Sequence, residues 1–217
     1  MKYELAIAHR VCPALAKVAV GFDDKLEMVK VAINSIAKAI DGIATKLIVI
    51  LDGCPVEYEQ LIDDVFTKVS SVDYERVSTS AIGNHATYAK QLELLSAFVD
   101  EAEYLYFSED DYIYRKDAFR AMMDFLKRPG VDFVTPLDHP DRYSHVVPER
   151  KKVEIRVSGY CHWREVGTTC CTFMMTRTIF MKTRKFLECY GKGGCDCTLW
   201  LGLTKDSVFS IYATIGV

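Results

Sequence analysis

The stretch YLYFSEDDYIY, residues 104–114, decides the fold because an aromatic and apolar run ends there at three consecutive carboxylates. Residues 104–107 have the length and the side chains of a buried strand. Three anionic side chains would lose their hydration and repel one another inside a core. Glu109, Asp110 and Asp111 are therefore expected where the strand leaves the sheet. In open α/β sheets, that is where ligands bind.

The same three acids suggest a bound cation. Carboxylate oxygens are hard ligands of the kind that Mg²⁺ and Mn²⁺ prefer in proteins. We therefore interpret the stretch as a metal site that holds a diphosphate. An acidic turn before a helix is also a common structural feature without any ligand, so the residues alone leave both interpretations open.

Around this stretch, short apolar runs alternate with segments whose apolar residues recur at helical spacing. Strands are expected at residues 3–8, 46–51, 74–78, 104–107 and 131–136. Helices are expected between them, the first with Asp24 as its N-cap and the last at residues 116–127. This alternation predicts an α/β fold with a central, mostly parallel mixed sheet, right-handed crossovers and helices on both faces.

The pattern changes after residue 136. A polar loop is expected at residues 137–152, an antiparallel strand at 153–157 and a second apolar strand at 168–176. A helix at 177–190, a glycine-rich loop at 191–194, a short helix at 198–203 and a last strand at 209–217 are expected to follow. Because the last strand runs to the final residue, we expect the chain to be the N-terminal domain of a longer protein.

The composition is that of a soluble globular chain, because 50% of the 217 residues are hydrophobic and 26% are charged. A net charge of −3 provides no basic field for nucleic acid. No apolar run approaches the roughly 20 residues of a membrane span, and the N-terminus lacks the apolar core of a secretory signal. The eight cysteines include no Cys-x-x-Cys pair, which disfavours a zinc site. We therefore expect a cytoplasmic protein with reduced thiols.

In their order, these elements resemble the GT-A fold of nucleotide-sugar-dependent glycosyltransferases of the family 2 type. The resemblance is carried by the first strand and helix, by LIVILDG at 47–53, by the loop and helix from Gly83, and by YLYFSEDDYIY. It covers most of the chain as an ordered pattern rather than as long identity. In this family an Asp-x-Asp motif at the end of a later strand binds the metal and the nucleotide. Glu-Asp-Asp, with a longer first acid, occupies that place here.

The resemblance implies one three-layer α/β/α domain over residues 1–217. It places the nucleotide-sugar in the half formed by residues 1–136 and the acceptor in the half formed by residues 137–217. It further implies transfer of a sugar from a nucleotide-diphosphate sugar to a hydroxyl of a carbohydrate or glycoconjugate. A UDP-sugar is the favoured donor, and Mn²⁺ or Mg²⁺ is the expected cofactor.

The resemblance also assigns roles to donor-site residues. Asp111, together with Glu109, is the expected metal ligand, and Glu109 and Asp110 are expected to meet the ribose directly or through metal-bound water. Asp52, after the second strand, would accept a hydrogen bond from uracil or ribose, or would otherwise form a strand-end Asp-Gly turn. Candidates for contacts with the base or the diphosphate, unless they are simply solvated, are His9, Arg10 and Lys90.

Asp196 matches the place of the family's general base, because it follows a glycine-rich loop and precedes a helix. Such a carboxylate takes the proton of the attacking acceptor hydroxyl, which predicts a single displacement with inversion. An N-cap role for the same residue is compatible. Tyr160, His162 and Trp163 form an aromatic cluster between the two late strands, either to stack on an acceptor sugar or to pack in the core. The family's third metal ligand, often a late histidine, has no clear counterpart.

Two other functions fit parts of this pattern. A sugar-phosphate nucleotidyltransferase shares the layout, but it needs a glycine-rich, basic loop after the first strand, and residues 11–20 hold no glycine and one lysine. A non-catalytic module that binds a nucleotide sugar or a carbohydrate would keep the fold without turnover. Turnover of a nucleotide sugar therefore separates the enzyme from the module.

Overall fold

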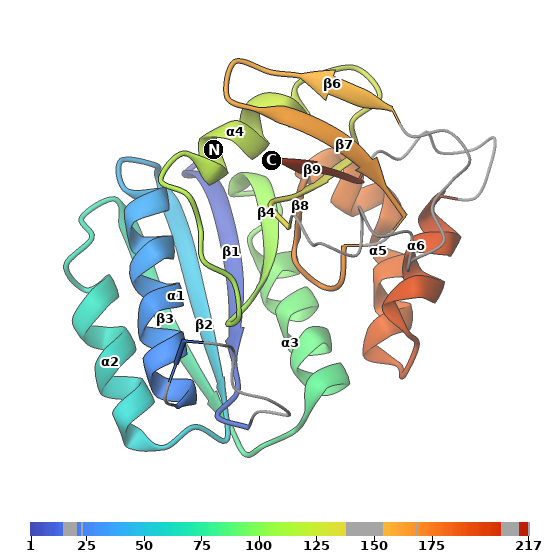
Figure 1. Cartoon of the computed structure of the whole chain (residues 1–217). Coiled ribbons are helices and arrows are strands. Elements are labelled where there is room, and N and C mark those ends of the chain that lie inside the picture. The colour runs from blue at the N-terminus through green and yellow to red at the C-terminus, as the bar shows by residue number, and fades with distance from the viewer. Residues whose placement is uncertain (15–20, 23, 138–153, 168, 205–212, 217) are drawn as a thin grey trace.

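A computed structural model describes residues 1–14, 21, 22, 24–137, 154–167, 169–204 and 213–216 of the chain (Figure 1). The strands are β1 Tyr3–Val11, β2 Thr45–Asp52, β3 Val72–Thr79, β4 Ala102–Glu109, β5 Phe133–Thr135, β6 Ile155–Val157, β7 His162–Val166, β8 Phe173–Thr176 and β9 Ala213–Gly216. The helices are α1 Lys25–Ile40, α2 Val56–Phe66, α3 Asn84–Ala97, α4 Ala118–Leu126, α5 Arg177–Gly191 and α6 Asp196–Thr204.

The described strands form one sheet in the order β3-β2-β1-β4-β8-β5-β9-β7-β6. The long strands β1 to β4 pair in parallel, whereas the shorter later strands add antiparallel pairs. The predicted α/β fold with a mixed sheet is confirmed. Because β1, β2 and β4 run in the same direction, their carboxyl ends meet at one edge of the sheet, the lower edge in Figure 1.

Helices cover both faces of the sheet. Side chains alternate between the two faces along each strand, so each face carries apolar side chains that must be buried. On one face, Ile7 and Val11 of β1 pack in a buried cluster with residues of α1, α2 and α4. On the other face, Ala6 and Ala8 pack with residues of α3, α5 and α6. All eight residues of β2 are buried, which explains the continuous apolar run from Leu47 to Leu51 in place of an alternating pattern.

The first helix forms as its sequence predicts. The Asp24 carboxylate accepts a hydrogen bond of 2.8 Å from the backbone N–H of Glu27, which caps the amino end of α1. Val29, Ile33 and Ile36 are completely buried against the sheet. The cap and the apolar stripe together fix where this helix starts and which side faces the core.

The later part of the sheet departs from the simple alternation of strands and helices. Phe173, Met174 and Met175 of β8 are all completely buried, so this strand needs neighbours on both edges and both faces. It lies between β4 and β5 and is antiparallel to both. The strand predicted at 131–136 therefore pairs with β8 instead of extending the parallel set.

Three predicted boundaries also change. His162 and Trp163, expected between two strands, lie within β7, where Trp163 is buried and its ring stacks on Phe125 with centroids 4.5 Å apart. The helix expected from 198 begins at Asp196. The strand expected at 209–217 is described only as β9, and the polar loop with its two histidines lies outside the described residues. No helix in the described ranges is long and apolar enough to cross a membrane.

Candidate functional site

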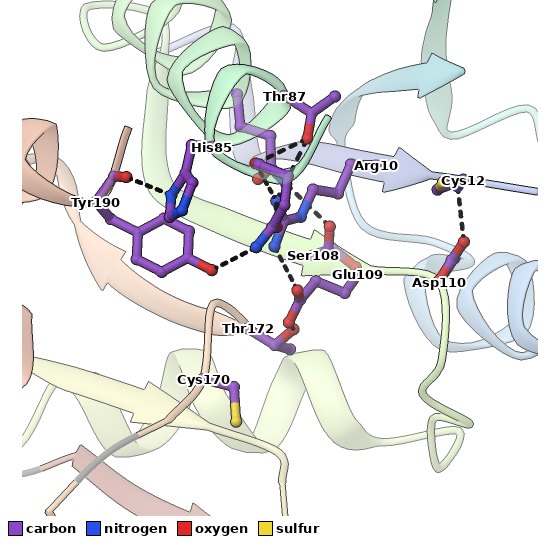
Figure 2. A network of polar contacts seen from close by, with 12 residues as sticks. Arg10, Cys12, His85, Thr87, Ser108, Glu109, Asp110, Cys170, Thr172 and Tyr190 are labelled. Carbon is purple, nitrogen blue, oxygen red and sulfur yellow. Dashed lines mark hydrogen bonds and ion pairs between the residues drawn. The ribbon is translucent and has the colours of Figure 1, made fainter. Parts of the chain in front are cut away.

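A pocket with about 520 Å³ of empty space, here called the rim pocket, lies where the carboxyl ends of β1, β2 and β4 meet the amino end of α3. Its lining gathers residues that are far apart in sequence: Arg10, Val11, Cys12, Asp52, Gly83, Asn84, Thr87, Glu109, Asp110 and Asp111. The three consecutive acids thus lie at the sheet edge, where the sequence predicts them. Figure 2 draws polar contacts of Glu109 and Asp110.

Glu109 is held by Arg10 of β1 and by Thr172, the residue before β8. Arg10 Nη2 donates to Glu109 Oε1 at 2.5 Å, and Thr172 Oγ1 donates to Glu109 Oε2 at 3.1 Å (Figure 2). Burial disfavours the charged guanidinium, but the charge of Glu109 and the groups around it raise the pKa of Arg10 above its usual value. Glu109 is therefore a partner of a buried arginine, and both of its oxygens are engaged within the protein.

Asp110 is held in a similar way. Lys25 Nζ donates to Asp110 Oδ1 at 2.7 Å, and the backbone N–H of Cys12 donates to Asp110 Oδ2 at 2.9 Å. The side chains of Lys25 and Asp110 are 8% and 13% exposed, so this ion pair is largely removed from water. It links the start of α1, the segment after β1 and the end of β4.

Asp111 differs from its two neighbours because it faces solvent and forms no ion pair with a described residue. Desolvation by the surrounding protein and the charges of Glu109 and Asp110 raise the pKa of its carboxyl to about 6. A cation would relieve this crowding of negative charge. Asp111 is thus the acid of the three that is available to a ligand.

The Asp52 carboxylate holds the chain segment that leads from β3 to α3. Its Oδ1 accepts hydrogen bonds from Thr79 Oγ1 at 2.7 Å and from the backbone N–H of Ile82 at 2.6 Å, and its Oδ2 accepts from the backbone N–H of Gly83 at 2.8 Å. Gly83 has a φ of 86°, which glycine adopts without strain. Asp52 therefore shapes the pocket wall, and the predicted contact with a base or ribose stays a prediction.

Asn84 is a pocket residue that the sequence analysis missed. Arg10 Nη1 donates to the backbone carbonyl of Asn84 at 2.8 Å and to its side-chain Oδ1 at 2.5 Å. Asn84 Nδ2 donates in turn to the Tyr190 hydroxyl at 2.8 Å, and His85 Nδ1 lies 2.8 Å from the Tyr190 carbonyl (Figure 2). The signal in the sequence was Gly83-Asn84 after a strand, but the partners are 74 and 106 residues away.

The structure does not bring His9 or Lys90 to the rim pocket. His9 points to the opposite face of β1 from Arg10 and is completely buried, with Nδ1 2.8 Å from Ser108 Oγ. Burial, and then the charge of Lys25, lower the pKa of His9 to about 3. Lys90 lies on the outer side of α3, where it pairs with Glu93 at 2.8 Å. We therefore no longer expect His9 or Lys90 to contact the base or the diphosphate.

The aromatic cluster divides between two roles. Trp163 is 1% exposed, so its ring faces the core and cannot lie flat on a sugar. Tyr160 is 42% exposed, and it lines a second pocket together with the edge of Trp163. His162 is exposed at the start of β7. The core alternative therefore holds for Trp163, and an acceptor contact stays open for Tyr160 and His162.

Asp196 is the first residue of α6 and is half-buried outside the lining of the rim pocket. Burial, and then the charge of Glu109, raise the pKa of the Cys171 thiol to about 12, and the charge of Asp196 adds to that rise. Asp196 and Glu109 thus both act on one buried thiol.

The described residues contain no group of three or more His, Cys, Asp and Glu side chains that could hold a metal ion by themselves. Mg²⁺, however, is commonly bound by one or two carboxylates together with substrate phosphates and water. The rim pocket and its bordering lysine bring together the four acids Asp52, Glu109, Asp110 and Asp111 with the two cations Arg10 and Lys25. This excess of negative charge fits a divalent cation, and Asp111 is the one of the three consecutive acids that pairs with no described cation.

No known family model matches the sequence, and no curated protein matches it either. Solved structures do match the fold. A Desulfovibrio desulfuricans G20 protein assigned as a nucleotide-diphospho-sugar transferase aligns with TM-score 0.55 and 8% identity over 97% of this chain and 79% of that chain. A cytidylyltransferase of Leptospira borgpetersenii aligns with TM-score 0.53 and 8% identity over 99% of this chain and 76% of that chain.

TarS of S. aureus, residues 1–349, aligns with TM-score 0.52 and 13% identity over 83% of this chain. The chain spans 49%, or about half, of that TarS chain. At these identities the likenesses show the fold alone. Transferases of nucleotide-diphospho-sugars and of cytidylyl groups both have this fold, so the fold does not choose between them.

Proposed function

We propose that this protein is a glycosyltransferase that binds a nucleotide-diphosphate sugar in the rim pocket and transfers the sugar to a hydroxyl of a carbohydrate or glycoconjugate. The observation that carries the proposal is that the three consecutive acids differ in their ion-pair partners. Glu109 and Asp110 are neutralised by Arg10 and Lys25, while Asp111 lines the pocket and pairs with no cation among the described residues. A UDP-sugar is the proposed donor.

In this proposal the chain's own residues prepare a place for the diphosphate. Arg10 and Lys25 reduce the repulsion that Glu109 and Asp110 would otherwise exert on a polyanion. Asp111 would hold Mn²⁺ or Mg²⁺ against the diphosphate, and Asn84 and Thr87 would position the nucleotide at the start of α3. A divalent ion bound there would stabilise the negative charge that develops on the departing diphosphate.

The acceptor would bind on the side built from the later part of the chain, which includes Tyr160 and His162. Asp196 would take the proton of the attacking hydroxyl as general base, which gives a single displacement with inversion. Support for this role is the position of Asp196 at the start of α6, directly after the glycine-rich turn.

The test is turnover of nucleotide sugars. The protein is incubated with Mn²⁺ and with UDP-, GDP- and dTDP-sugars in turn, and release of the nucleoside diphosphate is measured with and without carbohydrate acceptors. Asp196→Asn should lower the rate of transfer about 1,000-fold while the affinity for the donor stays the same. Asp124→Asn, a change on α4 away from both pockets, is the matched control. Unchanged transfer by Asp196→Asn would remove this residue from the mechanism.

A nucleotidyltransferase is the second candidate, because a cytidylyltransferase shares the fold over 99% of this chain and 76% of its own length. This candidate predicts release of pyrophosphate when the protein is given a nucleoside triphosphate and a sugar phosphate. The lack of glycine between residues 11 and 20 argues against it. Pyrophosphate release without any hydrolysis of nucleotide sugars would overturn the glycosyltransferase proposal.

A further inference from the structure

A second pocket, here called the α4 pocket, has about 460 Å³ of empty space and adjoins the segment that follows the three acids. Figure 1 shows this segment running back from the carboxyl end of β4 toward α4. The walls are mainly apolar and come from this segment, from α4, from the end of β5 and from β7 with its preceding turn. The main apolar side chains are Ile113, Tyr114, Met122, Pro136, Tyr160 and Trp163.

Large apolar side chains are left open to water at this pocket. Ile113 is 65% exposed and Tyr160 is 42% exposed, although the pocket floor is closed by Trp163 stacked on Phe125. Exposed apolar groups that gather at a hollow, rather than singly, commonly mark a binding site. The pocket therefore favours a ligand with an aliphatic or aromatic part.

The rim of the α4 pocket is basic. Arg115 and Asp117 belong to both the α4 pocket and a shallow adjoining hollow, which is also lined by Lys38, Lys116, Arg120 and Asp41. Four cations thus face two carboxylates. Arg115 pairs with Asp117 at 3.2 Å in an exposed salt bridge, and Arg120 donates to the uncharged backbone carbonyl of Asp41 at 3.1 Å, so the hollow keeps a net positive charge. An anionic group would be stabilised here.

We propose that the α4 pocket binds a small amphiphilic anion, with its aliphatic or aromatic part between Tyr160 and Met122 and its phosphate over Lys116 and Arg115. Ile113 of this pocket is two residues from Asp111 of the rim pocket, so the two pockets are neighbours along one segment. The α4 pocket is a site apart from the rim pocket, because the segment after Asp111 runs back from the carboxyl end of β4 toward α4, on the face of the sheet opposite to α6 and Asp196.

Binding can be measured without any turnover. The whole chain has two tryptophans, and Trp163 is in the pocket wall, so its fluorescence reports occupancy. The probes are octyl phosphate, phenyl phosphate, 1-octanol and inorganic phosphate, all below any micelle concentration, with calorimetry as the second measurement. Octyl phosphate or phenyl phosphate should bind at least about tenfold more tightly than 1-octanol and inorganic phosphate. A preference for octyl over phenyl phosphate indicates a lipid-like ligand, and the reverse indicates an aryl ligand.

Variants separate the two parts of the ligand. The double change Lys116→Gln and Arg115→Gln should weaken phosphate ester binding about tenfold and leave 1-octanol binding unchanged. Tyr160→Ala, at a partly exposed position, should weaken the phosphate esters and 1-octanol alike. The double change Lys30→Gln and Lys68→Gln, two exposed lysines near the α1–α2 groove, is the matched control and should change nothing.

Equal affinity for octyl phosphate and inorganic phosphate, or binding that both pocket variants leave intact, would overturn the site. Failure to bind or hydrolyse any nucleotide sugar would instead overturn the proposed function, and the binding result for the α4 pocket would be unaffected.

Discussion

The two pockets are built by different means although one segment of chain joins them. In the rim pocket, Glu109 and Asp110 are fixed by ion pairs, and Asp52 accepts three hydrogen bonds from the end of β3 and the loop after it. In the α4 pocket, the walls are rings and alkyl chains, and Ile113 and Tyr160 are exposed. The first arrangement fixes charges before a ligand arrives, while the second leaves apolar surface to be covered. The difference teaches that stability and ligand binding should depend on separate residues.

The largest expected effect is on the fixed charges of the rim pocket. Asp110→Asn leaves the Lys25 ammonium, which is 8% exposed, without its anionic partner. Removal of one member of a buried ion pair costs about 3–5 kcal/mol of unfolding free energy. Urea denaturation measures it. Arg177→Gln, which loses an exposed pair with Asp100, is the matched control and should show no loss beyond error. An equally stable Asp110→Asn would mean that the pair does not hold the pocket together.

The next effect is on ligand binding. Asp111→Asn should reduce the Mn²⁺-dependent affinity for the donor nucleotide about 100-fold or more, because changes one step further from a metal already cost 10- to 100-fold. Its unfolding free energy should be unaffected or slightly higher, since a crowded carboxylate is removed. Calorimetry with UDP and Mn²⁺ measures the affinity, with Asp64→Asn on α2 as the control. Undiminished affinity in Asp111→Asn would count against the metal assignment.

Part of the pH dependence of stability should come from the buried imidazole of His9. The pKa of His9 is about 3 in the folded chain because of burial and the charge of Lys25, and its ordinary value is 6.5. Below pH 6.5 the unfolded chain takes up a proton that folded His9 refuses, so stability falls as the pH falls. Between pH 7 and pH 5 this amounts to about 2 kcal/mol.

His9→Gln isolates this term, because glutamine can keep a hydrogen bond to Ser108 and does not titrate. Denaturation curves at pH 7 and pH 5 should show that wild type loses about 2 kcal/mol more than the variant. Parallel losses in both proteins would show that His9 is not kept neutral by the fold.

The smallest effect on stability is expected in the α4 pocket. Tyr160→Ala removes a side chain that is 42% exposed, so the unfolding free energy should change by no more than about 0.5 kcal/mol. Binding of octyl phosphate to the same variant should nevertheless weaken several-fold. A large loss of stability would show that Tyr160 is part of the core, and the contrast between the two pockets would disappear.

Much of this architecture could be predicted because it depends on local patterns. The buried run ending at Glu109, the N-cap at Asp24 and the apolar stripe of α1 are all visible within one turn or one strand. The acids were expected at the sheet edge because charges cannot enter a core. The position of β8 between β4 and β5 could not be predicted in this way, because strand order is a choice among partners far apart in the chain.

The ion-pair partners of the three acids could not be predicted from local sequence patterns either. Glu109 meets Arg10 from 99 residues away, and Asp110 meets Lys25 from 85 residues away. His9 was expected beside Arg10 because β1 was predicted to end at residue 8, whereas the strand continues to Val11. With three more residues in the strand, His9 and Arg10 point to opposite faces, and one of them is lost to the core.

The residues that line the two pockets occupy consecutive, non-overlapping stretches of the chain. The rim pocket uses positions from Arg10 to Asp111, and the α4 pocket uses positions from Ile113 to Trp163. A gene crossover near the codon of Tyr112 would therefore exchange one lining and leave the other untouched. Chimeras made at this point would let selection diversify one specificity at a time on an inherited scaffold.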